Sequence, residues 1–286
     1  MNRRNWIRNA LSSALALGMF RNSALAGTAE VPDRLAALER KHGGRLGVAI
    51  LDTESGRHLM HRANERFLMC STFKLLLVSL LLERVDAGKE RLDRRIVFGK
   101  DALLEYAPVT RQHVGKDGLT VGELCAAAIT LSDNTASDLL LHAVGGPAEV
   151  TAHARDLGDA ITRLDRLEPE LNRSDGEHDT TSPLAMLGDL RALILGDALS
   201  PASRGKMIDW MIGCETGLQS VRAGLPHGWR VGDKTGQGAH ENNDVVIAWP
   251  TGRRPVLISA YYQHDALAAD QRKAVLAEVG CIAAKI

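Results

Sequence analysis

"CSTFKLLLVSLLL", residues 70–82, is the stretch where the pattern of the chain changes from strands to helices. Its second part is an almost unbroken apolar run, which is typical of a buried helix, and Ser71 lies where that helix begins. The first turn of a helix has unpaired N–H donors and the positive end of the helix dipole. Lys74 follows three residues later on the same face, within reach of the serine hydroxyl. The pair suggests a reactive alcohol, although a lone serine–lysine pair is more often explained by a lysine extending to solvent.

Strand patterns lie on both sides of this stretch. "RLGVAILDT" (45–53) alternates apolar residues and precedes "GRHLMHR" (56–62) across a turn, which predicts a hairpin. Three strand-like runs return near the end, "GWRVGDKTG" (228–236), "NDVVIAWP" (243–250) and "RPVLISAYYQ" (254–263), followed by a helix at about 267–284. The pattern predicts an α+β fold, in which both chain ends form one antiparallel sheet of about five strands flanked by helices.

The sequence pattern in the middle of the chain predicts helices. Thr120 and Glu123 form a capping box, glycines 145 and 146 separate two helices, and Ser182 with Pro183 begins another. We therefore expect a single catalytic unit, residues 27–286, with an inserted all-helical lobe. Its α/β lobe would comprise 27–62 and 215–286, and its helical lobe 63–214.

Composition excludes several functions. Lysine plus arginine and aspartate plus glutamate number 35 each, so no net field attracts nucleic acid or an anionic membrane. No apolar run after residue 26 is long enough to serve as a membrane anchor. The four cysteines are too scattered for a disulfide scaffold and suggest buried apolar fillers, and the ten histidines form no metal motif. We expect no metal and no cofactor, and a monomer by default.

The first 26 residues resemble an export signal. A basic start precedes a modestly apolar centre, and Ala24 and Ala26 have the spacing of a cleavage site. Arg3 and Arg4 before Trp6 resemble a twin-arginine signal, while an ordinary secretory signal with two arginines remains the alternative. Either signal predicts a periplasmic protein.

Two further clusters bear on Ser71 and Lys74. The sequence Ser132-Asp133-Asn134 falls between two predicted helices and offers a hydroxyl and an amide, although alone it is an ordinary helix cap. The sequence 234–236, "KTG", lies at a strand end, where a cation and a hydroxyl could bind a carboxylate and the glycine permits close approach. Each cluster is weak evidence by itself.

Together, the motifs S-x-x-K, S-D-N and K-T-G in this order resemble those of class A serine β-lactamases and penicillin-binding proteins. The resemblance extends over nearly the whole chain after residue 26. It includes "EYAPVT" (105–110), "LSDNTASDLLL" (131–141), "RLEPELN" (166–172), "DTTSP" (179–183) and "GDKTG" (232–236). It implies a sheet lobe and a helical lobe with the active site between them, and hydrolysis of penicillins or cephalosporins.

The resemblance also implies the catalytic roles. Ser71 would attack the lactam carbonyl, and the backbone N–H groups of Ser71 and Gln237 would bind the oxyanion. Lys74, or Glu168 through a water molecule, would accept the proton, and Ser132 would pass a proton to the lactam nitrogen. The remaining substrate contacts would come from Tyr106, Asn134, Asn172, Lys234, Thr235 and Gly236, and an ion pair between Arg166 and Asp179 would close the loop that carries Glu168.

Glu168 and Asn172 separate the candidate functions. A β-lactamase needs a carboxylate aimed at water to hydrolyse its acyl-enzyme, and Glu168 matches that group, with Asn172 helping to hold the water. The alternatives are a D,D-peptidase and a penicillin-binding sensor domain that is acylated without turnover.

Several positions depart from the family pattern. The loop 173–178 is about two residues shorter than usual, and Gln237 stands where small residues are common. Val78 and Gly238 occupy positions that in some relatives are cysteines bridged to Cys125 and Cys70, so neither bridge is expected. Two candidates for an additional carboxylate-binding arginine, at positions 222 and 272, are interpreted as surface charges.

Overall fold

The computed structural model describes residues 30–115 and 117–286. The predicted export signal, residues 1–26, lies outside this part. No helix among the described residues is long and apolar enough to cross a membrane.

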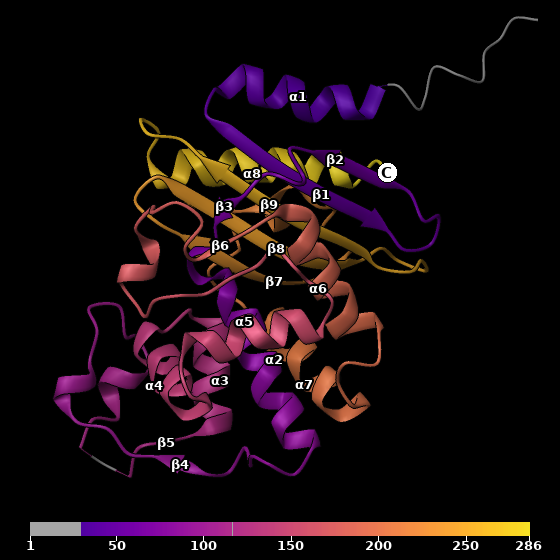
Figure 1. Ribbon diagram of the computed structural model, residues 1–286. Coiled ribbons are helices and arrows are strands. Elements are labelled where there is room, and N and C mark those ends of the chain that lie inside the picture. Colours follow the sequence, from indigo (N-terminus) through magenta and orange to yellow (C-terminus); the bar gives the residue numbers. More distant parts are fainter. Residues whose placement is uncertain (1–29, 116) are drawn as a thin grey trace, which may run out of the picture.

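A five-stranded antiparallel sheet forms the upper lobe in Figure 1, with the strand order β2–β1–β9–β8–β7. Its strands are β1 (Arg45–Asp52), β2 (His58–His61), β7 (Arg230–Gln237), β8 (Glu241–Trp249) and β9 (Val256–Gln263). Because β1 pairs with β9, for example Val48 opposite Ala260, strands from the two ends of the chain share one sheet. The α+β prediction and its sheet formed by both chain ends are therefore confirmed.

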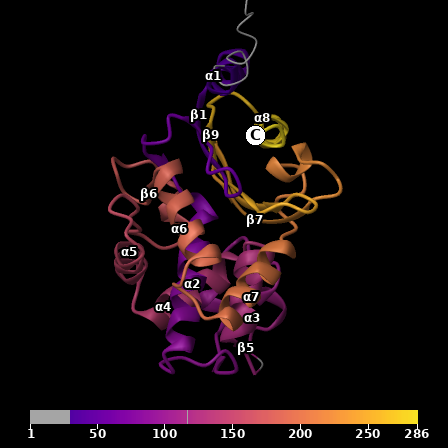
Figure 2. The ribbon, with the colours of Figure 1, turned by 90° about the vertical axis from the view of Figure 1, so that its right-hand side faces the viewer.

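Helices cover both faces of the sheet. Alternate residues of a strand point to opposite faces, so Val246 and Ile258 pack toward α1 and α8, whereas Val245 and Leu257 join the core shared with the helical lobe. Figure 2 shows α8 on one side of the sheet and α6 on the other. Since both faces are covered, β8 is buried along almost its whole length.

The helices have the following bounds: α1 (Glu30–His42), α2 (Phe73–Asp86), α3 (Val121–Thr130), α4 (Asn134–Val144), α5 (Pro147–Asp156), α6 (Pro183–Leu195), α7 (Pro201–Ile212) and α8 (Ala269–Ala283). The capping box of α3, the break between α4 and α5 at Gly145 and Gly146, and the proline start of α6 are present as predicted. Two short ladders pair β3 (Phe67–Leu68) with β6 (Thr180–Thr181) and β4 (Arg95–Ile96) with β5 (Leu119–Thr120), and the second lies at the end of the helical lobe away from the sheet (Figure 1).

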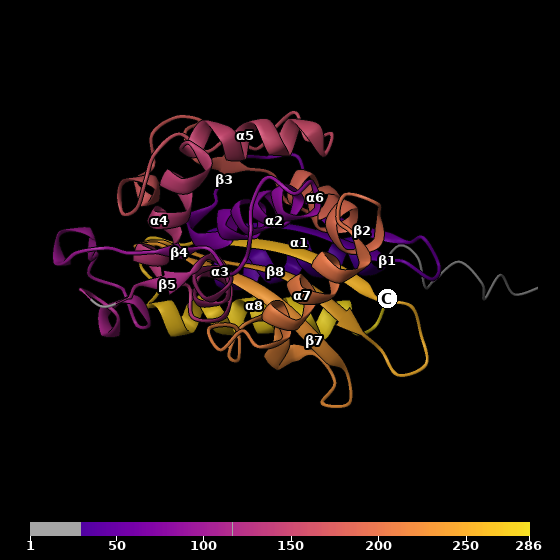
Figure 3. The ribbon, with the colours of Figure 1, turned by 90° about the horizontal axis from the view of Figure 1, so that it is seen from below.

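Helix α2 passes through the centre of the helical lobe. Every residue from Phe73 to Leu82 is buried, because α3, α4, α5 and α7 surround the helix (Figure 3). A helix that is apolar on all sides is stable only in such a position, and this explains the run at 75–82. Helix α6 lies within the segment 63–214 but packs against β1 and β9. The lobe boundaries stay a prediction.

Candidate active site

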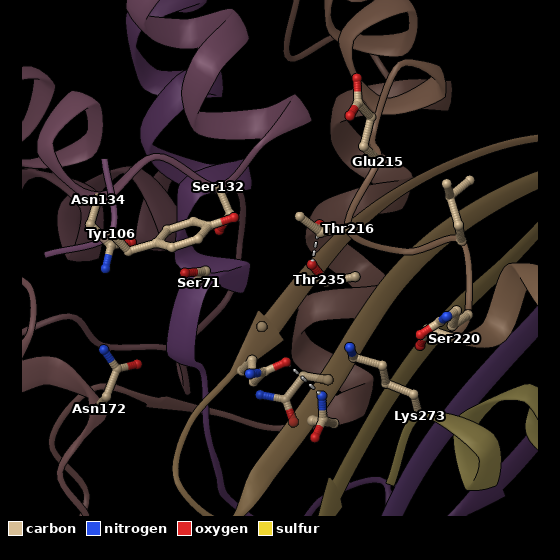
Figure 4. A pocket seen from close by; sticks show the side chains of 16 residues that line it. Ser71, Tyr106, Ser132, Asn134, Asn172, Glu215, Thr216, Ser220, Thr235 and Lys273 are labelled. Atoms are coloured by element: carbon tan, nitrogen blue, oxygen red, sulfur yellow. Dashed lines mark hydrogen bonds between the residues drawn. The ribbon is translucent and has the colours of Figure 1, made fainter. Parts of the chain in front are cut away.

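A cavity of about 580 Å³ lies where the edge strand β7 meets the start of α2. Sixteen residues line it (Figure 4). Eight of them are predicted site residues from distant segments: Ser71, Tyr106, Ser132, Asn134, Asn172, Thr235, Gly236 and Gln237. The three predicted residues outside the lining, Lys74, Glu168 and Lys234, are buried among the same segments.

Ser71 lies in a short 3-10 turn, Cys70–Thr72, that leads into α2. The turn begins with Cys70 in the left-handed region, at φ 45°, a strained conformation for a residue other than glycine. Asn243 of β8 holds the preceding backbone, because its Nδ2 donates to the carbonyls of Leu68 and Met69 at 2.9 and 3.0 Å. A Cβ at Gly236 would lie 2.6 Å from the Met69 carbonyl oxygen, so glycine is required for β7 to approach this turn.

Lys74 is fully buried behind the serine. Its Nζ donates to the carbonyl of Ser132 at 2.9 Å and to Oδ1 of Asn134 at 2.6 Å, and it lies 3.3 Å from Oε1 of Glu168. No hydrogen bond joins Nζ to the Ser71 hydroxyl in the described part of the chain. Burial lowers the pKa of Lys74, while the carboxylate of Glu168 opposes that shift. The lysine therefore connects three of the predicted segments.

Glu168 is 3% exposed. Nδ2 of Asn172 donates to its Oε2 at 2.6 Å, whereas Oε1 has no hydrogen-bond partner other than its ion-pair contact with Lys74. The backbone N–H of Glu168 donates to Asp138 of α4 at 3.2 Å, and burial raises the pKa of that aspartate to about 6. One carboxylate oxygen is thus held by Asn172, and the other faces the buried lysine.

The loop that carries Glu168 is closed by the predicted ion pair. Nε of Arg166 lies 2.5 Å from Oδ2 of Asp179, and Oδ1 of Asp179 accepts the backbone N–H groups of Asp165 and Arg166 at 2.8 and 3.0 Å. Asp179 is fully buried, so its carboxylate at the end of the loop replaces solvent for three donors from Asp165 and Arg166 at the start of the loop.

Replacing Asp179 with alanine should lower the free energy of unfolding by about 3 kcal/mol, because it leaves a guanidinium and two backbone N–H groups without their buried acceptor. Urea denaturation measures this change. Asp175→Ala is the matched control, since that exposed carboxylate lies 3.9 Å from the same arginine and should contribute less than about 1 kcal/mol. Equal losses in the two variants would contradict the prediction.

The S-D-N segment connects the cavity to Lys234. Ser132 has a φ of 59°, and its hydroxyl accepts from Nζ of Lys234 at 3.0 Å. Asp133 caps α4 and also accepts the backbone N–H groups of Val109 and Thr110, so it fixes the segment after Tyr106. Burial is the main reason that the pKa of Lys234 is lowered to about 8, and the positive charge of Lys74 contributes to the same shift.

The hydroxyl of Thr235 is fixed by the segment after α7, since its Oγ1 lies 2.5 Å from Oγ1 of Thr216. Gln237 at the end of β7 is exposed, and its side chain lies 3.5 Å from Nδ2 of Asn242. The cysteines are free, three buried and Cys281 exposed, and the described residues hold no metal-ligand group of three or more histidine, cysteine, aspartate or glutamate side chains.

The interpretation of Arg222 and Arg272 as surface charges was wrong. Arg272 is 4% exposed and donates to Oδ1 of Asn242 at 2.7 Å, and Nε of Arg222 donates to the buried Asp233 at 2.8 Å. Neither lines the cavity; the cation that does is Lys273. Sequence reasoning missed Lys273 because only the packing of α8 decides which of its side chains reaches the cavity.

Other lining residues were also missed, namely Glu215, Thr216, Leu218, Gln219, Ser220, Asn242 and Asn243. The residues at 215–220 follow α7 in a segment without regular periodicity. The only sequence signal that could have suggested them is that they lie about 20 residues before K-T-G, on the segment that leads into the same strand, β7.

The fold and the site are those of a known class of enzymes. A solved structure described as the last common ancestor of Gram-negative bacteria (GNCA4) beta-lactamase class A is 56% identical, with a TM-score of 0.86, and the match covers 88% of this chain and 97% of that one. The two-lobed architecture is therefore that of class A β-lactamases.

Sequence comparisons agree. The model of the beta-lactamase enzyme family matches residues 30–286. Beta-lactamase L2 of Stenotrophomonas maltophilia is 46% identical over 289 residues, which cover 97% of this chain and 95% of that protein. Beta-lactamase OXY-2 of Klebsiella oxytoca is 41% identical over 281 residues, 97% of each. The chain belongs to the beta-lactamase enzyme family, as a class A serine β-lactamase.

Proposed function

We propose that this protein hydrolyses the amide bond of penicillins and cephalosporins through an acyl-enzyme on Ser71, and thereby gives its host resistance to these antibiotics. The observation that carries the proposal is the buried lysine network behind the serine, in which Lys74 Nζ contacts Ser132, Asn134 and Glu168. The names of the relatives support the substrate class.

In the acylation step, the Ser71 hydroxyl attacks the lactam carbonyl and loses its proton. The depressed pKa of Lys74 makes a neutral amine accessible, and Glu168 acting through water is the second candidate base. The backbone N–H groups of Ser71 and Gln237 stabilise the oxyanion. The proton reaches the departing lactam nitrogen through Ser132, whose hydroxyl already accepts from Lys234.

Substrate binding is assigned to the walls of the cavity. Thr235 and the buried Lys234 hold the substrate carboxylate, with Gly236 allowing the ligand to approach β7. Asn134 binds the side-chain amide of the antibiotic, and the half-exposed ring of Tyr106 forms an aromatic wall.

Deacylation depends on Glu168. A carboxylate that is buried, held on one oxygen by Asn172 and free of hydrogen bonds on the other is suited to take a proton from a water molecule near the ester. Asn172 lines the cavity and positions this water. The shortened loop 173–178 follows directly and shapes the same pocket.

Steady-state hydrolysis of a chromogenic cephalosporin tests the proposal, together with the mass of the protein before and after the reaction. We expect many turnovers per molecule and return to the free mass. A burst of one equivalent with a lasting adduct would instead indicate a sensor domain. Release of D-alanine from an acyl-D-Ala-D-Ala peptide without β-lactam turnover would indicate a D,D-peptidase.

We further propose that the protein acts in the periplasm as a monomer. The pattern of residues 1–26, with Arg3 and Arg4 ahead of an apolar centre and small residues at the cleavage site, supports export, and the twin-arginine route is the finer proposal.

A further inference from the structure

Glu215 places an unpartnered carboxylate on the wall of the candidate active site. It lines the cavity and is exposed, and its side chain makes no ion pair or hydrogen bond with any described residue. Its backbone is fixed, because its N–H donates to the carbonyl of Thr130 at 3.0 Å, at the end of α3. The backbone position of Glu215 is therefore set by the fold, and its carboxylate is free to meet a ligand in the cavity.

The carboxylate lies on the wall next to the proposed carboxylate-binding strand. Thr216 follows it directly and contacts Thr235 of β7. Figure 4 shows Glu215, Thr216 and Thr235 in sequence along one wall, with Asn172 at the opposite end of the cavity. Leu218, two residues after Thr216, also lines the cavity; it is 57% exposed and offers an apolar surface.

Neither lysine near this wall neutralises Glu215. Lys273 lines the cavity, but its Nζ pairs with Asp270 at 3.1 Å, and Lys234 is buried against Ser132. No ion pair joins Glu215 to either of them in the described part of the chain. The wall therefore presents separate points of positive and negative charge, and an exposed carboxylate beside an anion site weakens the binding of a purely anionic ligand.

We propose that Glu215 selects β-lactams that carry an aromatic cation on the ring fused to the lactam, on the same side as the substrate carboxylate. This inference rests on the proposed function. The substrate carboxylate binds at Lys234 and Thr235, the cation lies beside the Glu215 carboxylate, and the aromatic ring packs on Leu218. The attraction is partly screened by solvent, so its effect is several-fold rather than many thousand-fold.

The experiment compares two cephalosporins with the same thienylacetyl side chain, one with a neutral acetoxymethyl group and one with a cationic pyridiniomethyl group on the six-membered ring. The quantity is the ratio of kcat/KM for the cationic over the neutral substrate. Glu215→Gln should lower this ratio about five-fold, and Glu215→Lys should lower it further. In about 1 M salt, where the Debye length is about 3 Å, the wild-type ratio should approach that of Glu215→Gln.

Asp197→Asn is the control, because this exposed carboxylate does not line the cavity, and the variant should keep the wild-type ratio. Since both substrates are measured on each variant, a loss of folded protein cancels in the ratio. An unchanged ratio in Glu215→Gln and Glu215→Lys, with both substrates hydrolysed, would overturn the role of Glu215 alone. Failure of the wild type to turn over either substrate would remove the proposed function and this inference together.

Discussion

Glu168→Ala is expected to react with a cephalosporin and then stall, with steady-state turnover about a thousand-fold below that of the wild type. The reason is that the variant keeps Ser71, Lys74 and Ser132 but lacks the carboxylate that Asn172 holds at 2.6 Å. Mass spectrometry should show a lasting adduct of one substrate molecule per protein, and the pre-steady-state burst should equal the enzyme concentration.

Glu170→Ala is the matched control for this variant. Glu170 lies two residues further along the same loop, and its side chain is exposed and outside the cavity lining, so its removal should leave turnover within about two-fold of the wild type. Rapid turnover by Glu168→Ala would remove Glu168 from its role in deacylation.

Lys74→Met is expected to slow acylation itself by about a thousand-fold. Methionine fills the buried space but cannot accept the serine proton, and it leaves the carboxylate of Glu168 buried without its cation at 3.3 Å. Stopped-flow measurement of a single turnover, with the enzyme in excess over the cephalosporin, gives the acylation rate directly. In Lys74→Met, the acyl adduct of the kind that accumulates in Glu168→Ala should therefore form only slowly.

Lys89→Met, at an exposed lysine beyond the far end of α2, tests whether the loss of a lysine charge has a general effect, and we expect wild-type acylation. Acylation by Lys74→Met within ten-fold of the wild type would contradict the role of Lys74 and would identify Glu168 with its water as the base. Together, the two variants at positions 168 and 74 distinguish the two candidate bases.

Local patterns were sufficient to predict several of the secondary elements. The capping box at Thr120 and Glu123, the proline after Ser182 and the alternation in 45–53 each depend on neighbours within a few residues, and each appears in the structure. The strand and helix patterns predicted the fold class and the resemblance predicted the family, and the comparisons confirm both. The roles of the site residues stay predictions.

Side chains whose neighbours come from distant segments could not be predicted in this way. Arg272 looked like a surface charge, but helix α8 buries it against β8, where Asn242 and the Gly238 carbonyl replace its water. Lys273, the next residue, reaches the cavity instead. One residue of difference along a helix turns a side chain by about 100°, so only the packed orientation of α8 decides between them.

The sequence by itself determined the α+β fold class, because periodicity and caps depend on neighbouring residues, and the resemblance of its three motifs to those of class A β-lactamases indicated the family. The tertiary structure decided which polar and charged side chains contact one another. Lys74, Ser132 and Glu168 are separated by tens of residues, and they share one buried network only because α2 is enclosed by its neighbours and the Arg166–Asp179 pair closes the loop. Burial and distance set pKa values and ion pairs, and both depend on the folded arrangement.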